Sequence, residues 1–241
     1  MLPAQAPRSC LRQQSGVVVL IMLLILILGS ATLLLTKLNK NDSRPSHNVA
    51  VAQDLGAVRA ALLGHSLING NCLPCPDLSG DGLAQASCGS GAPVAGFLPW
   101  ATLNLGVTDV WGRRLRYVVD PDFTGSGSCT ITAGMAGDIR VQGYDQLGNP
   151  YDLTSDSPAA IISHGANGYG ATHADGATLP NPPPGHGDEE INRTGTTLLV
   201  QRVSTDDPAM AGGPFDDLVV WVSLNAYKTQ LENINGGPLP P

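Results

Sequence analysis

The chain begins with a short polar segment that runs directly into a long stretch without charged residues. That stretch extends over the twenty residues from Val17 to Thr36. A helix rises about 1.5 Å per residue, so twenty residues match the roughly 30 Å hydrocarbon core of a bilayer. The apolar part of a secretory signal is shorter, about 7–15 residues. The sequence therefore predicts a membrane-spanning helix near the N-terminus.

The rest of the composition limits the class of the protein. Roughly 200 of the 241 residues follow the apolar stretch, which is enough for one domain with its own core. The 29 Gly and 19 Pro, with 14% charged residues, indicate a turn-rich domain with strands rather than a helical bundle. The net charge of -7 argues against a nucleic-acid partner, because phosphate binding needs a basic surface.

The cysteines indicate the compartment. Cys10 precedes the apolar stretch, and four cysteines follow it: Cys72, Cys75, Cys88 and Cys129. An even set suits two disulfides in an oxidising compartment, which places the C-terminal domain outside the cytoplasm. The alternatives are a redox CxxC pair or half a zinc site. Among the disulfide pairings, Cys72 with Cys75 is the least favourable because Pro74 stiffens a very small ring. We favour Cys75 with Cys88 and Cys72 with Cys129.

A kinked amphipathic helix is predicted over residues 37–68. Pro45 disfavours helix at the residue before it, so a break is expected there. Beyond it, four apolar residues recur at spacings of four, three and four: Val51, Leu55, Val58 and Leu62. They share one helix face, which should lie on the core of the following domain.

Residues 69–241 predict a β-rich, disulfide-bonded domain. Six β-branched runs predict strands of an antiparallel sheet: residues 115–119, 129–133, 139–144, 160–163, 197–203 and 218–222. Gly148-Asn149 predicts a hairpin turn, and residues 165–195 a long surface loop. A last helix should follow Ser223, with one apolar face formed by Leu224, Tyr227, Leu231 and Ile234. The predicted fold class is α+β, a long membrane-spanning helix packed on an antiparallel sheet.

The leader Arg12-Gln13-Gln14-Ser15-Gly16, followed by the apolar stretch, resembles the N-terminal signal of type IV pilins and type II secretion pseudopilins. The resemblance implies that residues 1–16 form a prepilin leader, which prepilin peptidase removes between Gly16 and Val17. The new N-terminus would be methylated, and residues 17–36 would form the transmembrane and fibre-core helix. The assembly helix would use Val17, Ile21, Leu24 and Leu28.

Two positions depart from the family pattern. The family has Phe at the first mature position and Glu at the fifth, where this chain has Val17 and Ile21. In the family that Glu is thought to neutralise the N-terminal ammonium of a neighbouring subunit, since an unpaired charge in an apolar core is costly. Minor and tip subunits often lack it, so Ile21 favours such a subunit. The turn Asp109-Val110-Trp111-Gly112 also resembles a turn of pseudopilin C-terminal domains.

The resemblance implies a non-enzymatic subunit of a type II secretion or type IV pilus machine. It would be a single-pass protein of the bacterial inner membrane with a periplasmic C-terminal domain, or a subunit at the fibre tip. The implied partners are other pilin or pseudopilin subunits, prepilin peptidase and the inner membrane. The alternative function is a membrane-tethered periplasmic hydrolase or ligand-binding domain.

One loop has part of a calcium-binding pattern. Asp77, Ser79 and Asp81 offer oxygens at positions one, three and five, with Gly82 at position six. The twelfth position holds Cys88 instead of a bidentate Glu, which rules out a regular EF-hand. The sequence leaves open an irregular calcium site or a turn held by disulfides, and calcium is the one cofactor that this loop suggests.

Two acidic clusters and one Ser-His pair complete the candidates. Residues 188–190 and 216–217 are expected to be solvated loop or strand-entry residues rather than metal ligands. Ser163-His164 suggests a hydrolase triad with Asp175 or Asp188, but adjacent Ser and His do not easily act as nucleophile and base. No Gly-x-Ser-x-Gly motif accompanies them. We therefore expect that the protein is not an enzyme.

Overall fold

The computed structural model describes residues 19–27, 43–126 and 129–241. The chain divides into two units, Met1–Ser46 and His47–Pro241. In the first unit, residues 19–27 are helical. The side chains of Ile21 and Leu24 are each 53% exposed there, while Gly16, Val17 and Leu28 lie outside the described residues.

The prediction of a membrane-spanning helix is wrong. Across the described parts of the chain, every helix is too short or too polar to cross a bilayer. The predicted fold class is corrected accordingly, and so is the predicted location as a single-pass inner-membrane protein with a periplasmic domain. The fold is α+β.

Helix α2, Ser43–Ile68, is helical through Pro45, so the predicted break at Pro45 does not occur within the described residues. The predicted apolar stripe is confirmed, since Val51, Leu55, Val58 and Leu62 are at most 5% exposed. The opposite face carries polar and small residues that remain exposed.

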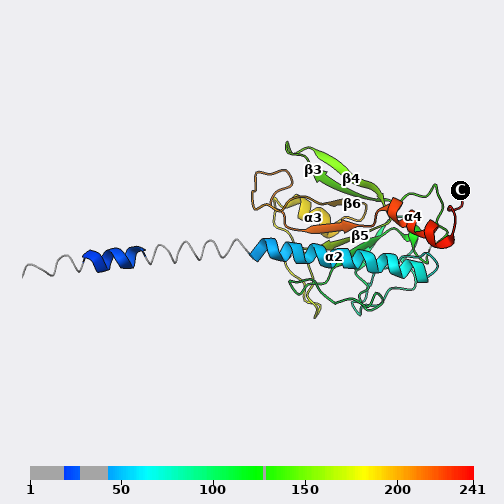
Figure 1. The fold of residues 1–241 in the computed structure, drawn as a ribbon, viewed down its shortest axis with the longest axis horizontal. Helices are drawn as coiled ribbons and strands as arrows, with labels where there is room; N and C mark the ends of the chain where they lie inside the picture. Colours follow the sequence, from blue (N-terminus) through cyan, green and yellow to red (C-terminus); the bar gives the residue numbers. More distant parts are fainter. Residues whose placement is uncertain (1–18, 28–42, 127–128) are drawn as a thin grey trace, which may run out of the picture. The chain divides into compact units, whose positions relative to one another are not determined.

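The main sheet has four antiparallel strands in the order β1-β2-β5-β7. Its strand β5 is labelled in Figure 1. Their bounds are β1 Val94–Phe97, β2 Arg116–Val119, β5 Ala159–Ser163 and β7 Leu218–Trp221. Every residue of β5 is buried. This burial follows from its central position, because both faces of the strand pack against other layers.

A second sheet has three strands in the order β4-β3-β6: β4 Pro150–Ser157, β3 Ile139–Tyr144 and β6 Leu198–Val200. β3 and β4 form the predicted hairpin, whose turn is closed by hydrogen bonds between Asp145 and Asn149. The sequence predicted an antiparallel sheet. β3 and β6 instead pair in parallel, so this part of the prediction is wrong.

The two faces of the main sheet pack against different layers. Side chains alternate along a strand, so Tyr117 and Ile161 join the core with α2, whereas Val118 and Ile162 join the core with the second sheet. Helix α4, Leu224–Asn235, packs on the α2 side with Leu224, Tyr227 and Leu231. Its predicted cap is confirmed, because Ser223 Oγ accepts from the Ala226 amide. Ile234 is 56% exposed, contrary to prediction.

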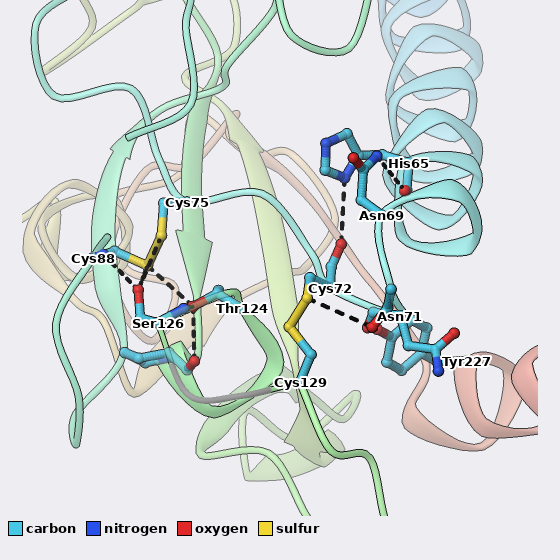
Figure 2. The surroundings of a disulfide bond; sticks show 12 residues. His65, Asn69, Asn71, Cys72, Cys75, Cys88, Thr124, Ser126, Cys129 and Tyr227 are labelled. Atoms are coloured by element: carbon cyan, nitrogen blue, oxygen red, sulfur yellow. Dashed lines mark hydrogen bonds between the residues drawn. A yellow bond between two sulfur atoms is a disulfide. The ribbon is translucent and has the colours of Figure 1, made fainter. Parts of the chain in front are cut away.

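The loop after α2 is fastened by two disulfides, Cys72–Cys129 and Cys75–Cys88 (Figure 2). This is the pairing that the sequence favoured, and it excludes a redox CxxC pair or a zinc site at these cysteines. The Tyr227 hydroxyl donates to the carbonyl of Asn71, one residue before the first disulfide. The C-terminal end of α2 is therefore tied to both the loop and α4.

Candidate functional site

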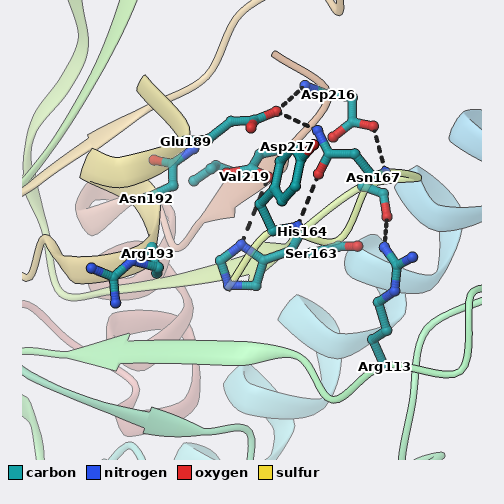
Figure 3. Close-up of polar contacts among 12 residues, drawn as sticks. Arg113, Ser163, His164, Asn167, Glu189, Asn192, Arg193, Asp216, Asp217 and Val219 are labelled. Atoms are coloured by element: carbon teal, nitrogen blue, oxygen red, sulfur yellow. Dashed lines mark hydrogen bonds and ion pairs between the residues drawn. The ribbon is translucent and has the colours of Figure 1, made fainter. Parts of the chain in front are cut away.

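Buried polar side chains gather where β5 ends and β7 begins (Figure 3). The antiparallel register pairs Ser163 with Leu218, so the residue after β5, His164, meets the residue before β7, Asp217. His164 Nδ1 lies 3.7 Å from Asp217 Oδ1, and both side chains are at most 3% exposed. Strand pairing thus brings together two ionisable groups that are more than fifty residues apart in the sequence.

Helix α3, Gly187–Thr194, adds a third group to this place. Its residues Asp188, Glu189 and Asn192 are buried although they are polar. Asn192 fixes the helix beside β6, because its side-chain amide donates to the Val200 carbonyl at 2.9 Å and accepts from the Val200 amide at 2.8 Å. This arrangement directs Glu189 toward Asp216 and Asp217.

We call Glu189, Asp216 and Asp217 the carboxylate cluster. Each offers one oxygen, and these oxygens all lie within 4.8 Å of one another. Glu189 is fully buried, and Asp217 is 3% exposed. Burial raises the pKa of Asp216 to about 7, and the nearby charges of Asp217 and Glu189 act in the same direction, against the backbone hydrogen bond from Asn167.

Hydrogen bonds hold two members of the carboxylate cluster in place. Glu189 Oε1 accepts from Asn167 Nδ2 at 2.6 Å and from the Asp216 amide at 3.2 Å, and Glu189 Oε2 lies 2.9 Å from His186 Nδ1. Asp216 Oδ2 accepts from the Asn167 amide at 2.8 Å. Gly165 permits this close approach, since a Cβ there would lie 2.2 Å from the Asp216 carbonyl oxygen.

A basic cavity of about 270 Å³ lies on the other side of His164. Three arginines line it. Arg114 precedes β2, Arg116 is the first residue of β2, and Arg193 belongs to α3. Burial lowers the pKa of Arg116 to about 10; repulsion by Arg193 adds to this effect, and attraction by Asp217 opposes it. His164 therefore separates a basic cavity from the acidic carboxylate cluster.

The structure does not assemble the hydrolase triad. The Ser163 hydroxyl donates to Asp109 Oδ2 at 2.7 Å, and Ser163 is buried. Asp188 accepts from Arg202 Nε at 2.7 Å and from the Tyr144 hydroxyl at 3.1 Å, while Asp175 accepts from its own turn at the Ala177 amide. Neither aspartate is available to orient His164, so these residues have structural roles.

The calcium pattern at Asp77, Ser79 and Asp81 forms a compact turn. Asp77 is fully buried, and its Oδ1 accepts from the amides of Ser79 and Gly80 at 2.9 and 2.7 Å. Its Oδ2 accepts from the Gly82 amide at 2.7 Å. These hydrogen bonds use both oxygens for the loop itself, so the arrangement favours the alternative of a turn, while calcium binding there stays a prediction.

From the sequence, residues 188–190 and 216–217 were interpreted as two separate acidic clusters, and their proximity in the fold was not predicted. Joining them requires the position of α3, which has no signal in apolar periodicity because its buried residues are polar. Among the described residues, the carboxylate cluster is the one group of three or more His, Cys, Asp or Glu side chains placed to share a metal ion.

Comparison with protein-family models, with curated proteins and with solved structures finds no match for this chain.

Proposed function

We propose that this protein is a non-enzymatic subunit of the pilin or pseudopilin type, of the minor or tip class. Prepilin peptidase would cut it between Gly16 and Val17, and the segment after the cut would assemble with other pilin-like subunits. The residues that support this are the leader from Arg12 to Gly16, the uncharged stretch after it and Ile21 at the fifth mature position.

The packing of α2 is the observation that carries the proposal. The helix buries a single stripe, which includes Val51, Leu55 and Leu62, and leaves Gln53 and Asp54 exposed. The loop after its C-terminal end is fastened through the Cys72–Cys129 disulfide. A helix that packs on the domain through residues 51–62, followed by a covalently fastened loop, suits a subunit that transmits load from an N-terminal segment to a folded domain.

The alternative of a tethered hydrolase has less support. A nucleophilic serine needs a base within about 2.6–3.2 Å. The hydroxyl of Ser163 instead points to Asp109, a carboxylate that also accepts backbone hydrogen bonds. A ligand-binding role for the basic cavity at Arg114 and Arg116 is compatible with a subunit that recognises another protein.

The test is the mass of the chain after co-expression with a prepilin peptidase. Loss of Met1 to Gly16 and the added mass of one methyl group on Val17 are the expected result. Gly16→Leu should block the cut, because a side chain before the scissile bond would disturb a site that accepts glycine. Gly29→Leu places the same side chain later in the uncharged stretch and should leave cleavage intact. A full-length chain in a host whose own prepilins are processed would refute the proposal.

A further inference from the structure

Asp217 is a buried carboxylate without a hydrogen-bond donor. Its side chain is 1% exposed, and neither of its oxygens has a hydrogen-bond partner among the residues that the structure describes. The nearest basic atom is His164 Nδ1, at 3.7 Å from Oδ1, which also has no hydrogen-bond partner. A buried and uncompensated carboxylate costs several kcal/mol, so a positive species is expected beside it.

Asp216 presents a second unused oxygen to the same place. Its Oδ1 is buried and has no hydrogen-bond partner within the described parts of the chain, whereas Oδ2 is held by Asn167. Glu189 completes the group, within the 4.8 Å that spans all three. Three carboxylates at such separations repel one another unless a cation or protons neutralise them.

We propose that the carboxylate cluster of Glu189, Asp216 and Asp217 binds a hard divalent cation of the size of Ca²⁺. Carboxylate oxygens are the ligands that such cations prefer. Calcium–oxygen distances of about 2.3–2.6 Å allow ligands to stand up to about 5 Å apart across the ion, while the shorter bonds of Mg²⁺ allow about 4 Å. The oxygens of the cluster lie within 4.8 Å of one another, a limit that the larger ion accommodates throughout.

The surroundings keep the ligands in position. Asn167 donates from its side chain to Glu189 and from its backbone to Asp216 (Figure 3). His186 Nδ1 contacts the second Glu189 oxygen. Such contacts orient ligand carboxylates around an ion. They leave the Asp217 carboxylate and Asp216 Oδ1 for the cation.

A protonated His164 is the main alternative as the partner of Asp217. At 3.7 Å its Nδ1 is beyond hydrogen-bond distance from Oδ1. It would also leave Asp217 Oδ2 and Asp216 Oδ1 without a partner. One cation among the three carboxylates accounts for all of these oxygens together.

The experiment is titration of the chelator-treated, disulfide-intact full chain with calcium chloride by isothermal calorimetry, with magnesium chloride as the comparison. We expect one Ca²⁺ per chain, with an affinity at least tenfold higher than for Mg²⁺. Calcium at a hundredfold excess over its dissociation constant should raise the midpoint of thermal unfolding by about 5–10 °C. Absence of calcium binding up to about 1 mM would overturn the proposal, since sites of extracellular modules still bind in that range.

Two variants locate the ion. Asp217→Asn should lower calcium affinity at least tenfold, because it removes a ligand charge. Asp81→Asn, an exposed residue in the loop with the calcium pattern, is the matched control and should leave the affinity unchanged. If Asp217→Asn does not fold, Asp216→Asn at the half-buried position should show the same loss. Calcium binding that survives these cluster variants, or that Asp81→Asn abolishes, places the ion elsewhere and contradicts the proposal.

Discussion

The hydroxyl of Ser163 donates a 2.7 Å hydrogen bond to Oδ2 of Asp109, and both residues are buried. The other oxygen of Asp109 accepts from the amides of Trp111 and Arg113, at 2.9 and 3.1 Å. Gly112, with a φ of 75°, allows the chain to reverse there. One carboxylate therefore shapes the turn before β2 and fastens it to the end of β5.

We expect Ser163→Ala to lower the free energy of unfolding by about 1–2 kcal/mol, because Asp109 stays buried and loses one donor. Asp109→Ala should cost about 2–4 kcal/mol, since a hydroxyl and two amides lose their acceptor. Urea unfolding followed by circular dichroism measures both. Ser155→Ala, at an exposed position of β4, is the control and should change stability by less than about 0.5 kcal/mol. Equal effects of Ser163→Ala and Ser155→Ala would show that the hydrogen bond contributes nothing.

The two disulfides should differ in their contribution to stability. Cys72–Cys129 closes a sequence separation of 57 residues, and Cys75–Cys88 closes one of 13. In the chain-entropy model these loops correspond to about 4 and about 3 kcal/mol. Replacing Cys72 and Cys129 by serine should therefore lower the urea midpoint more than replacing Cys75 and Cys88. The opposite order would mean that the short loop around Asp77 is the more important element.

Strands with a clear pattern were predictable. The expected run at residues 139–144 coincides with β3, and the starts or ends of β2, β5 and β7 differ by one residue from those predicted. The predicted strand at 129–133 does not form. Cys129, which forms the disulfide with Cys72, has a φ of 49°, outside the region of extended strands. The disulfide pairing was expected, but the backbone conformation at Cys129 was not.

The carboxylate cluster was less predictable, for a physical reason. Helix α3 has no apolar face, because its buried residues are the polar Asp188, Glu189 and Asn192. Apolar periodicity therefore could not identify the helix within the predicted loop at residues 165–195. The meeting of His164 with Asp217 depends on the register of β5 with β7, which a single strand pattern does not specify.

The attachment of α2 to the sheet is tested by Leu55→Ala. Leu55 is fully buried in the core shared by α2 and β2, so its truncation should lower the free energy of unfolding by about 2–5 kcal/mol. Gln53→Ala, two residues earlier on the exposed face, should stay within about 0.5 kcal/mol. Chemical denaturation of both variants gives the comparison. A cost for Leu55→Ala below about 1 kcal/mol would mean that the helix is only loosely held.

Stability in alkaline solution should depend on Tyr227. Burial raises its pKa to about 12, although a side-chain hydrogen bond with Ser66 acts in the opposite direction. In the unfolded chain a tyrosine titrates near pH 10. Between about pH 10 and 12 the unfolded chain therefore loses a proton that the folded chain keeps. The resulting stabilisation is complete below pH 10 and is lost as the pH rises through 12.

Tyr227→Phe removes this contribution. It also removes the hydrogen bond to the Asn71 carbonyl, so we expect a loss of about 1–2 kcal/mol at pH 7. Between pH 10 and 12 the stability difference between the two proteins should shrink, because only the wild-type chain retains the Tyr227 titration. Arg116, whose pKa burial lowers to about 10, is common to both proteins and cancels in the difference. The pKa of Tyr117 is raised by burial and by the charge of Tyr227, so the loss of Tyr227 also reduces the Tyr117 shift and changes the difference in the same direction. Urea midpoints of the wild-type chain and of Tyr227→Phe at pH 7, 9, 10.5 and 11.5 measure the stability difference. Parallel stability curves over that range would show that Tyr227 titrates as in the unfolded chain.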